Sequence, residues 1–284
     1  MARTIPVYIL LLLPSFALAG DLEDALAAYS KKDYDLAIAR LTAHIREHPR
    51  SAEAISNRGM VYSAKKEYGK AIEDYSEAIR LDPKSAEFYK GRGIAYGGKK
   101  DFDKAIKDFS ESIRLDPKEA SAYYNRGSAY SQKEEYEKAI KDYAEAIRVH
   151  PKLADAYSSR GAAYDAVKKY DQAIKDYTEA IRLEPNNPFA YNNLAWILAT
   201  CPKDGVRDGK KAVEYATTAC KLSEWKDSGN LDTLAAAYAE SGDFKEAVKR
   251  QREAIKLGFD DRNVLQRSRQ RLELYQGGKP YRVK

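Results

Sequence analysis

Residues 52–83 read AEAISNRGMVYSAKKEYGKAIEDYSEAIRLDP, and similar stretches recur along the 284-residue chain every 34 residues. The interval is clearest in its prolines, small residues and tyrosines: Pro49, Pro83, Pro117, Pro151 and Pro185; Ala37, Ala71, Ala105, Ala139 and Ala173; Gly59, Gly93, Gly127 and Gly161; Tyr62, Tyr96, Tyr130 and Tyr164. Such a period indicates a solenoid, in which each unit packs only against its neighbours. Solenoids present long surfaces to partners, and the repeat itself requires no catalytic chemistry.

Each unit contains two helical patterns that meet near residues 66–67. Ile55, Gly59 and Tyr62 share one helix face, and a second face follows with Ala71, Ile72, Tyr75, Ala78 and Ile79. Small residues would let the two helices approach closely, while the tyrosine rings fill the space between units. Pro83 is expected to start the next helix, where its missing N–H is harmless.

This pattern resembles the tetratricopeptide repeat (TPR), with tyrosine at the position where tryptophan is usual: Tyr89, Tyr123, Tyr157 and Tyr191. The resemblance implies an all-α protein, a right-handed α-solenoid of about seven TPR helical hairpins with a C-terminal capping helix. Residues 194–202 and 232–238 resemble the carboxy-terminal units of many bacterial TPR proteins. The expected units are 20–51 (divergent), 52–85, 86–119, 120–153, 154–187, 188–227 (with an insertion), 228–261, and a capping helix with a basic tail at 262–284.

The first nineteen residues read as a secretory signal peptide. Arg3 precedes an apolar stretch over residues 5–18, and Ala17-Leu18-Ala19 forms an A-x-A cleavage site. A membrane anchor is the alternative, but these 14 apolar residues are fewer than the roughly 20 that a helical span needs. We therefore expect an exported protein, periplasmic or secreted, with no stable membrane span after cleavage.

A charge pair is repeated within the units. Arginine precedes the repeat glycine and aspartate follows sixteen residues later in four units: Arg58 and Asp74, Arg92 and Asp108, Arg126 and Asp142, Arg160 and Asp176. In the first unit the corresponding residues are Asp24 and Arg40, with the signs exchanged. An exchange within one unit predicts salt bridges inside each hairpin, so these arginines are interpreted as structural rather than ligand-binding.

In TPR proteins the first helix of each hairpin lines the concave face, which makes that face the expected binding site. Asn57, Asn125 and Asn193 share one register on it, and Tyr124, Asn192 and Trp196 adjoin them. Amide side chains both donate and accept hydrogen bonds, so we expect them to hold an extended peptide or a partner helix. The alternative is a plain solvated face. The lysines of the known carboxylate clamp are replaced by Glu53, Glu87, Ser121 and Asp155, so an acidic C-terminal peptide is not expected.

A competing hypothesis comes from lysines at the end of each first helix, which we call the lysine rim: Lys31, Lys32, Lys65, Lys66, Lys99, Lys100, Lys133, Lys168 and Lys169. With a net charge of +6 and a basic tail, such a rim could bind an anionic polysaccharide or another polyanion. The alternative is that lysine complements the negative end of the helix dipole.

The sequence indicates binding rather than catalysis. It contains no recognisable nucleophile motif, phosphate-binding loop or zinc motif, so we expect a non-enzymatic protein without cofactor, metal or nucleic-acid partner. His44 and His48 share a helix face but lack an apparent third ligand. Cys201 and Cys220 are expected to lie too far apart for a disulfide, although the insertion at 201–208 leaves that open.

Overall fold

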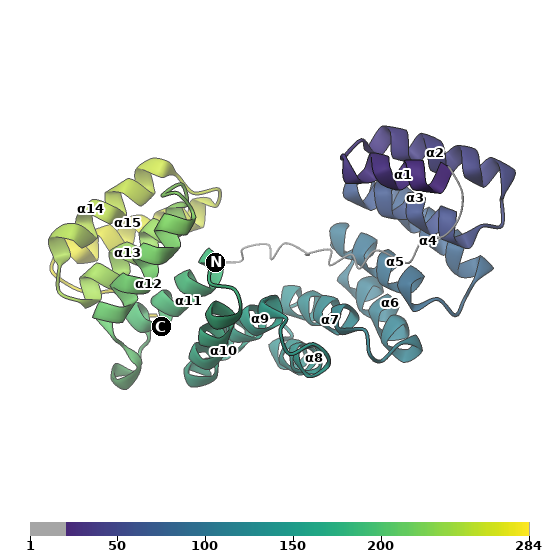
Figure 1. Ribbon diagram of the computed structural model, residues 1–284. Coiled ribbons are helices and arrows are strands. Elements are labelled where there is room, and N and C mark those ends of the chain that lie inside the picture. The colour runs from purple at the N-terminus through teal and green to yellow at the C-terminus, as the bar shows by residue number, and fades with distance from the viewer. Residues whose placement is uncertain (1–20, 284) are drawn as a thin grey trace. The chain divides into compact units, whose positions relative to one another are not determined.

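The computed structural model describes residues 21–283, and it is all-α across that range (Figure 1). The predicted fold class is therefore confirmed. The signal peptide expected at residues 1–19 lies outside the described residues. No helix within 21–283 has the length and apolar character needed to cross a bilayer. The described chain divides into two compact units, residues 21–151 and 152–283, which we call the N-terminal and C-terminal units.

The N-terminal unit is a stack of four helical hairpins. Each odd-numbered helix packs against the next even-numbered one, and α2, α4 and α6 in turn pack against the hairpin that follows. We call the first helix of each hairpin the A helix and the second the B helix. The helices are α1 (Asp21–Ser30), α2 (Tyr34–Glu47), α3 (Ala52–Ala64), α4 (Tyr68–Leu81), α5 (Ala86–Gly98), α6 (Phe102–Leu115), α7 (Ala120–Gln132) and α8 (Tyr136–Val149).

The C-terminal unit contains three further hairpins and a terminal helix. Its elements are α9 (Ala154–Ala166), α10 (Tyr170–Leu183), α11 (Pro188–Thr200), the 3-10 helix η1 (Asp204–Val206), α12 (Gly209–Leu222), α13 (Ser228–Glu240), α14 (Phe244–Leu257) and α15 (Arg262–Gln276). Helix α15 packs on α14 and α13. It buries Val264, Ser268, Arg271 and Tyr275, which recur at helical spacing, and thus covers the last hairpin.

Polar caps and prolines set the helix boundaries. The Ser51 and Asp101 side chains accept hydrogen bonds from backbone amides in the first turns of α3 and α6. The expectation for Pro83 is wrong, because α4 ends at Leu81 and α5 begins only at Ala86. Asp82 before the proline is extended (φ −135°, ψ 92°), as the proline ring demands, so Pro83 lies in the turn between repeats.

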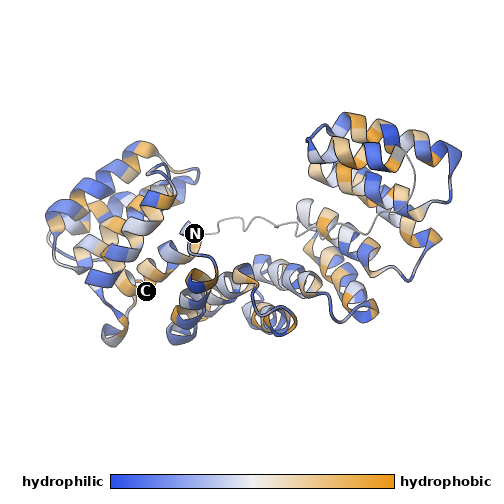
Figure 2. Ribbon diagram, in the orientation of Figure 1, coloured by the Kyte–Doolittle hydropathy of each residue, from blue (hydrophilic) through white to orange (hydrophobic). Residues whose placement is uncertain are grey.

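In successive hairpins, an alanine lies where the A helix and the B helix of the same hairpin approach closely. Five of these alanines are completely buried: Ala37, Ala71, Ala105, Ala139 and Ala173. Buried rings from the B helices fill the adjoining space: Tyr75, Phe109, Tyr143 and Tyr177. Apolar residues accordingly alternate with polar ones along the helices (Figure 2). Small residues bring the backbones together, and the rings fill the space beside them.

Gly91 shows how tight one of these ring contacts is. It lies in α5, in the register that holds Asn57 and Asn125 in other units. A Cβ atom on Gly91 would come within 2.4 Å of two carbons of the Tyr75 ring. Because Tyr75 is only 6% exposed, its ring has no free space into which it can turn. Gly97 in the same helix has no neighbouring atom within 4 Å of such a Cβ.

These two glycines give a matched test of the packing between hairpins. Gly91→Ala should lower the free energy of unfolding by about 1–3 kcal/mol, because it overpacks the Tyr75 contact. Gly97→Ala should raise it by about 0.5–1 kcal/mol through helix propensity alone. Denaturant unfolding followed by circular dichroism measures both. Equal stabilisation by the two substitutions would show that the contact with Tyr75 is not close.

Candidate functional site

Arginine and aspartate form bidentate ion pairs inside four hairpins. Arg126 Nε lies 2.7 Å from Asp142 Oδ2, and Arg126 Nη2 lies 2.8 Å from Asp142 Oδ1. The aspartate side chain is 8% exposed and that of the arginine 20%, so water screens the pair only partly. The same two contacts join Arg58 to Asp74, Arg92 to Asp108 and Arg160 to Asp176.

In the N-terminal unit the same guanidinium groups also bind the preceding hairpin. Arg126 Nη1 donates to Ser110 Oγ at 3.0 Å, while that hydroxyl donates to the carbonyl of Ile106. Sequence reasoning missed this contact, although hydroxyl residues recur at the 34-residue interval. The corresponding bonds join Arg92 to Ser76 and Arg58 to Thr42. Three of the four guanidinium groups, including that of Arg160 in the C-terminal unit, also lie 5.7–5.9 Å from a tyrosine ring centre. The pairs are Arg92 with Tyr89, Arg126 with Tyr123, and Arg160 with Tyr157. These arginines therefore serve the packing of the repeat.

The peptide-binding residues predicted in the N-terminal unit are Asn57 on α3 and two consecutive residues of α7, Tyr124 and Asn125. All three are largely buried, at 8%, 5% and 5% exposure. The Tyr124 ring lies 5.7 Å from the ring of Tyr143 on α8, and Asn125 Oδ1 is buried without a hydrogen-bond partner among the described residues. These side chains lie between helices, so they present little more than an edge to a ligand.

The remaining predicted residues, Asn192, Asn193 and Trp196, lie together on α11 in the C-terminal unit. Asn193 is hydrogen bonded to the hydroxyl of Tyr177 on α10, and burial raises the pKa of Tyr177 well above its usual range. Asn192 is 8% exposed and its Nδ2 lies 3.5 Å from Asn193 Oδ1. Three of the six predicted residues thus lie in each unit. Trp196 differs from the others because residues near the carboxyl end of the chain lie against its ring.

The last residues of the chain lie across the A-helix face of the C-terminal unit. Residues 279–283, which we call the tail, turn back at Gly278 (φ +66°) and have no regular secondary structure. The Tyr281 ring lies 5.9 Å from the ring of Trp196. The backbone N–H of Val283 donates to the carbonyl of Thr200 at 3.0 Å. That carbonyl lies at the end of α11, where helix geometry leaves it without a partner inside the helix.

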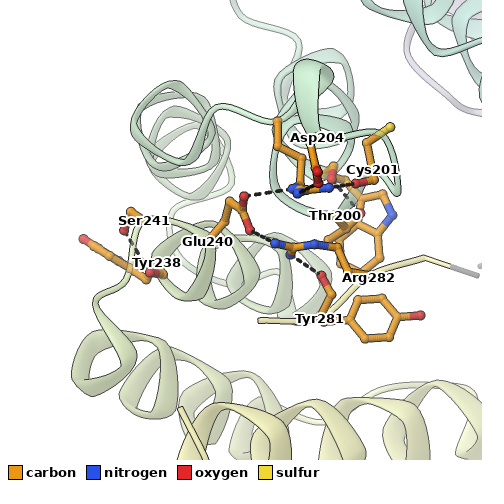
Figure 3. Close-up of polar contacts among 10 residues, drawn as sticks. Thr200, Cys201, Asp204, Tyr238, Glu240, Ser241, Tyr281 and Arg282 are labelled. Atoms are coloured by element: carbon orange, nitrogen blue, oxygen red, sulfur yellow. Dashed lines mark hydrogen bonds and ion pairs between the residues drawn. The ribbon is translucent and has the colours of Figure 1, made fainter. Parts of the chain in front are cut away.

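An ion pair adds a third anchor for the tail (Figure 3). Arg282 Nη2 lies 2.5 Å from Glu240 Oε2 at the end of α13. The other carboxylate oxygen of Glu240 accepts from Arg207 Nε at 2.9 Å. Arg207 belongs to the insertion after α11; it also donates to the carbonyl of Cys201 and pairs with Asp204. The insertion therefore fixes the carboxylate that receives the tail.

Arg271 of α15 completes the surface on which the tail lies. Its guanidinium lies 5.5 Å from the Trp196 ring centre and 5.3 Å from that of Tyr281. Asp232 of α13 holds Arg271 in a buried ion pair of 2.8 Å, with side-chain exposures of 2% and 6%. Gln251 bonds both Asp232 and Ser268. We call Trp196, Thr200, Glu240 and Arg271 the tail site. From its sequence, Arg271 was expected only to belong to the capping helix and basic tail at 262–284.

A pocket of about 230 Å³ adjoins the tail at Val283. Trp196 and Thr200 form part of its wall, and Asp165 of α9 and Tyr170 of α10 contribute from the preceding hairpin. Burial raises the pKa of Asp165 to about 6. Aromatic, hydroxyl and carboxyl groups thus continue the tail site towards α9.

Comparisons with known families agree with this geometry. Models described as tetratricopeptide repeat match residues 120–153, 154–187 and 176–212, and one described as TPR repeat matches 59–100 and 98–134. The chain belongs to the tetratricopeptide repeat family. Among curated proteins, none matches its sequence.

Solved TPR structures resemble the chain over different lengths. The crystal structure of MamA is 30% identical, covers 57% of this chain and 94% of its own, and has a TM-score of 0.53. A TPR protein from Parabacteroides merdae is 17% identical over 90% of this chain and 97% of its own, with a TM-score of 0.59. YrrB, described as a TPR protein with an unusual peptide-binding site, is 18% identical over 69% and 97%, with a TM-score of 0.55. The last two show a shared fold alone. The family to which the chain belongs supports protein–protein interaction through a TPR scaffold.

The lysine rim coincides with the ends of the TPR A helices. In five hairpins the residue just beyond the A helix has a left-handed backbone, with φ of 59–62°. Four of these residues are rim lysines and the fifth is Glu134: Lys32, Lys66, Lys100, Glu134 and Lys168. Glycine is usual at such a helix end because it lacks a Cβ atom. Lys65 and Lys133 precede this position and pair at 2.5 Å with aspartates of the preceding hairpin, Asp35 and Asp103. The rim is thus partly neutralised, and no observation favours a polyanion ligand.

The reactive side chains of the TPR hairpins are buried or dispersed. Cys201 and Cys220 are free and buried, and burial raises the pKa of the Cys220 thiol to about 12, which keeps it protonated. The rings of His44 and His48 lie 4.7 Å apart. Among residues 21–283, no three histidine, cysteine or acidic side chains are grouped to hold a metal ion.

Arg126→Leu should lower the free energy of unfolding by about 2–4 kcal/mol, because it leaves the Asp142 carboxylate buried without its partner. Thermal and denaturant unfolding measure the change. Arg114→Leu serves as the control, since the Arg114–Glu111 pair lies on the surface and should contribute little. An unfolding curve for Arg126→Leu that matches the parent would show that the bidentate pair does not stabilise the hairpin.

A second stability prediction concerns the left-handed helix ends. Lys100→Gly should raise the free energy of unfolding by about 0.5–1 kcal/mol, since glycine removes the Cβ strain at φ 62°. Its neighbour Lys99 has a helical backbone (φ −79°), so Lys99→Gly should lower stability by about 0.5–1 kcal/mol. Both lysines are exposed, and each substitution removes one positive charge. Stabilisation by Lys99→Gly as well would contradict the backbone explanation.

Proposed function

We propose that this protein is a non-catalytic scaffold that binds an extended peptide of a partner protein on the A-helix face of its TPR hairpins. The observation that carries the proposal is the tail itself. A segment without regular secondary structure lies on α11, α13 and α15, held by a ring contact, a main-chain hydrogen bond and an ion pair. These are the kinds of contact by which proteins recognise extended peptides.

An extended peptide is favoured over a partner helix by the groups that the tail uses. The carbonyl of Thr200 accepts a backbone N–H from Val283, which a helix would already have used in its own ladder. The Trp196 ring and the Glu240 carboxylate then select side chains on either side of that bond. A fold neighbour, YrrB, is described as carrying an unusual peptide-binding site, so peptide binding is compatible with this fold.

The proposal places the scaffold outside the cytoplasm, in the periplasm or in the secreted fraction. Its support is the segment at residues 1–19, with Arg3, an apolar stretch and an A-x-A cleavage site. A scaffold there would hold together exported proteins. The groups on the A-helix face include amides, hydroxyls, aromatic rings and carboxylates such as that of Glu240, which suit recognition of an extended peptide.

Selection from a phage-displayed library of random peptides on the purified chain tests the proposal. Synthetic copies of the enriched peptides should bind in the micromolar range, and Trp196→Ala should weaken them by at least about tenfold through loss of ring stacking. Trp225→Ala should leave binding unchanged, because Trp225 follows α12 and contacts Arg250 away from the tail site. Failure to enrich any peptide both on this chain and on the same chain ending at Gly278, or binding that survives Trp196→Ala, would contradict peptide binding at this face.

A further inference from the structure

The tail site is fixed by contacts that do not involve the tail. Asp232, Gln251 and Ser268 hold Arg271 in place, and Arg207 holds the Glu240 carboxylate. Trp196 and Thr200 belong to α11, whose neighbours α10, α12 and α13 pack around it. A surface built in this way keeps its shape when its occupant leaves, which is the property that lowers the cost of binding a ligand.

The tail is less buried than the surface on which it lies. Residues 280–283 are partly exposed and Lys279 is exposed. Two glycines, Gly277 and Gly278, separate the tail from α15, and a Cβ on Gly278 would meet no atom within 4 Å. Glycine permits many backbone conformations at such a junction. The tail can therefore leave while α15 stays packed through Val264, Ser268 and Tyr275.

The occupied site also defines the chemistry of what fits it. An aromatic ring lies against Trp196 and Arg271, the next residue places a positive charge on Glu240, and the one after it supplies a backbone N–H to Thr200. The tail meets these requirements with Tyr281, Arg282 and Val283. The pocket that adjoins Val283 gives room for a side chain larger or longer than the tail provides.

We propose that the tail is an intramolecular ligand of the tail site, and that partner peptides with the same aromatic–basic–aliphatic order bind there by displacing it. This inference rests on the proposed function and adds to it the regulation of the site and the class of peptide bound. In the resting protein the tail occupies the site at the high local concentration that its short tether ensures. A partner must then exceed the tail in affinity or be present in excess.

The test uses a fluorescein-labelled peptide with the sequence of residues 277–284, GGKPYRVK, and fluorescence anisotropy. Two proteins are compared: the chain from residue 20 onwards and the same chain ending at Gly278. We expect the probe to bind the shortened chain at least about tenfold more tightly. A probe with the Tyr281→Ala and Arg282→Glu changes should bind neither. Equal affinity for the two proteins, or no binding to a shortened chain with normal helicity, would overturn the inference.

A full-length variant covers the case in which the shortened chain does not fold. The double substitution Tyr281→Ala and Arg282→Glu should release the tail and raise the affinity for the unaltered probe by at least about tenfold. Lys279→Ala is the matched control, because Lys279 is exposed and contributes no side-chain anchor to the tail site. Probe affinity that stays at the parent value in the double variant would overturn the inference.

Further outcomes distinguish this inference from binding of the tail to a second copy and from the proposed function alone. Dimers of the full-length chain that disappear when the tail is removed would mean that the tail binds a second copy, which overturns the intramolecular assignment. Library peptides that depend on Trp196, yet bind with equal affinity whether or not the tail is present, would uphold the proposed function and overturn the role of the tail. Failure of the library selection on both proteins would instead overturn the proposed function.

Discussion

The close approach of helices at small residues is the constraint on which this structure depends. Alanines such as Ala71 and Ala105 are fully buried where two helices meet, and no larger side chain would leave the backbones at that distance. The ring of Tyr75 extends from α4 to Gly91 of the next hairpin, while the ring of Phe109 packs on Gly93 within its own hairpin. Because these contacts recur every 34 residues, the geometry of one hairpin is reproduced by the next, and each packs mainly on its neighbours.

In the N-terminal unit, the repeated arginines also orient each hairpin on the preceding one. A guanidinium group has five donors in a fixed plane, and Arg126 uses them to bind Asp142 in its own hairpin and Ser110 in the preceding one. One side chain therefore closes a hairpin and orients it on its neighbour. It also removes the most prominent cations of the A helices from any ligand-binding role. What remains for recognition is a face of amides, hydroxyls, carboxylates and rings, together with the groups at the end of the array.

The end of the array supplies the distinctive site. The insertion after α11 contributes Arg207, and α15 contributes Arg271. Neither residue belongs to the 34-residue pattern, and both position groups that contact the tail. Departures from the repeat thus create a surface that differs from every regular hairpin. The proposed peptide recognition would take place on this surface, while the regular hairpins present a more uniform face.

The sequence by itself determined the helical hairpins, their 34-residue register and the partners of the repeated arginines, because these depend on local periodicity and on residues that recur at fixed distances. It did not reveal that Asn125 is largely buried, since exposure depends on how closely the surrounding helices pack. The position of Pro83 was also misread, because a proline at the start of a helix and one in the turn before it look alike in sequence. The tail site could be seen only in the tertiary structure. Trp196 lies in the repeat register of Met60 and Ile94, but Glu240 belongs to a later hairpin, and Arg271 and Tyr281 follow the last one. Only the packing of α11, α13 and α15 brings these residues together.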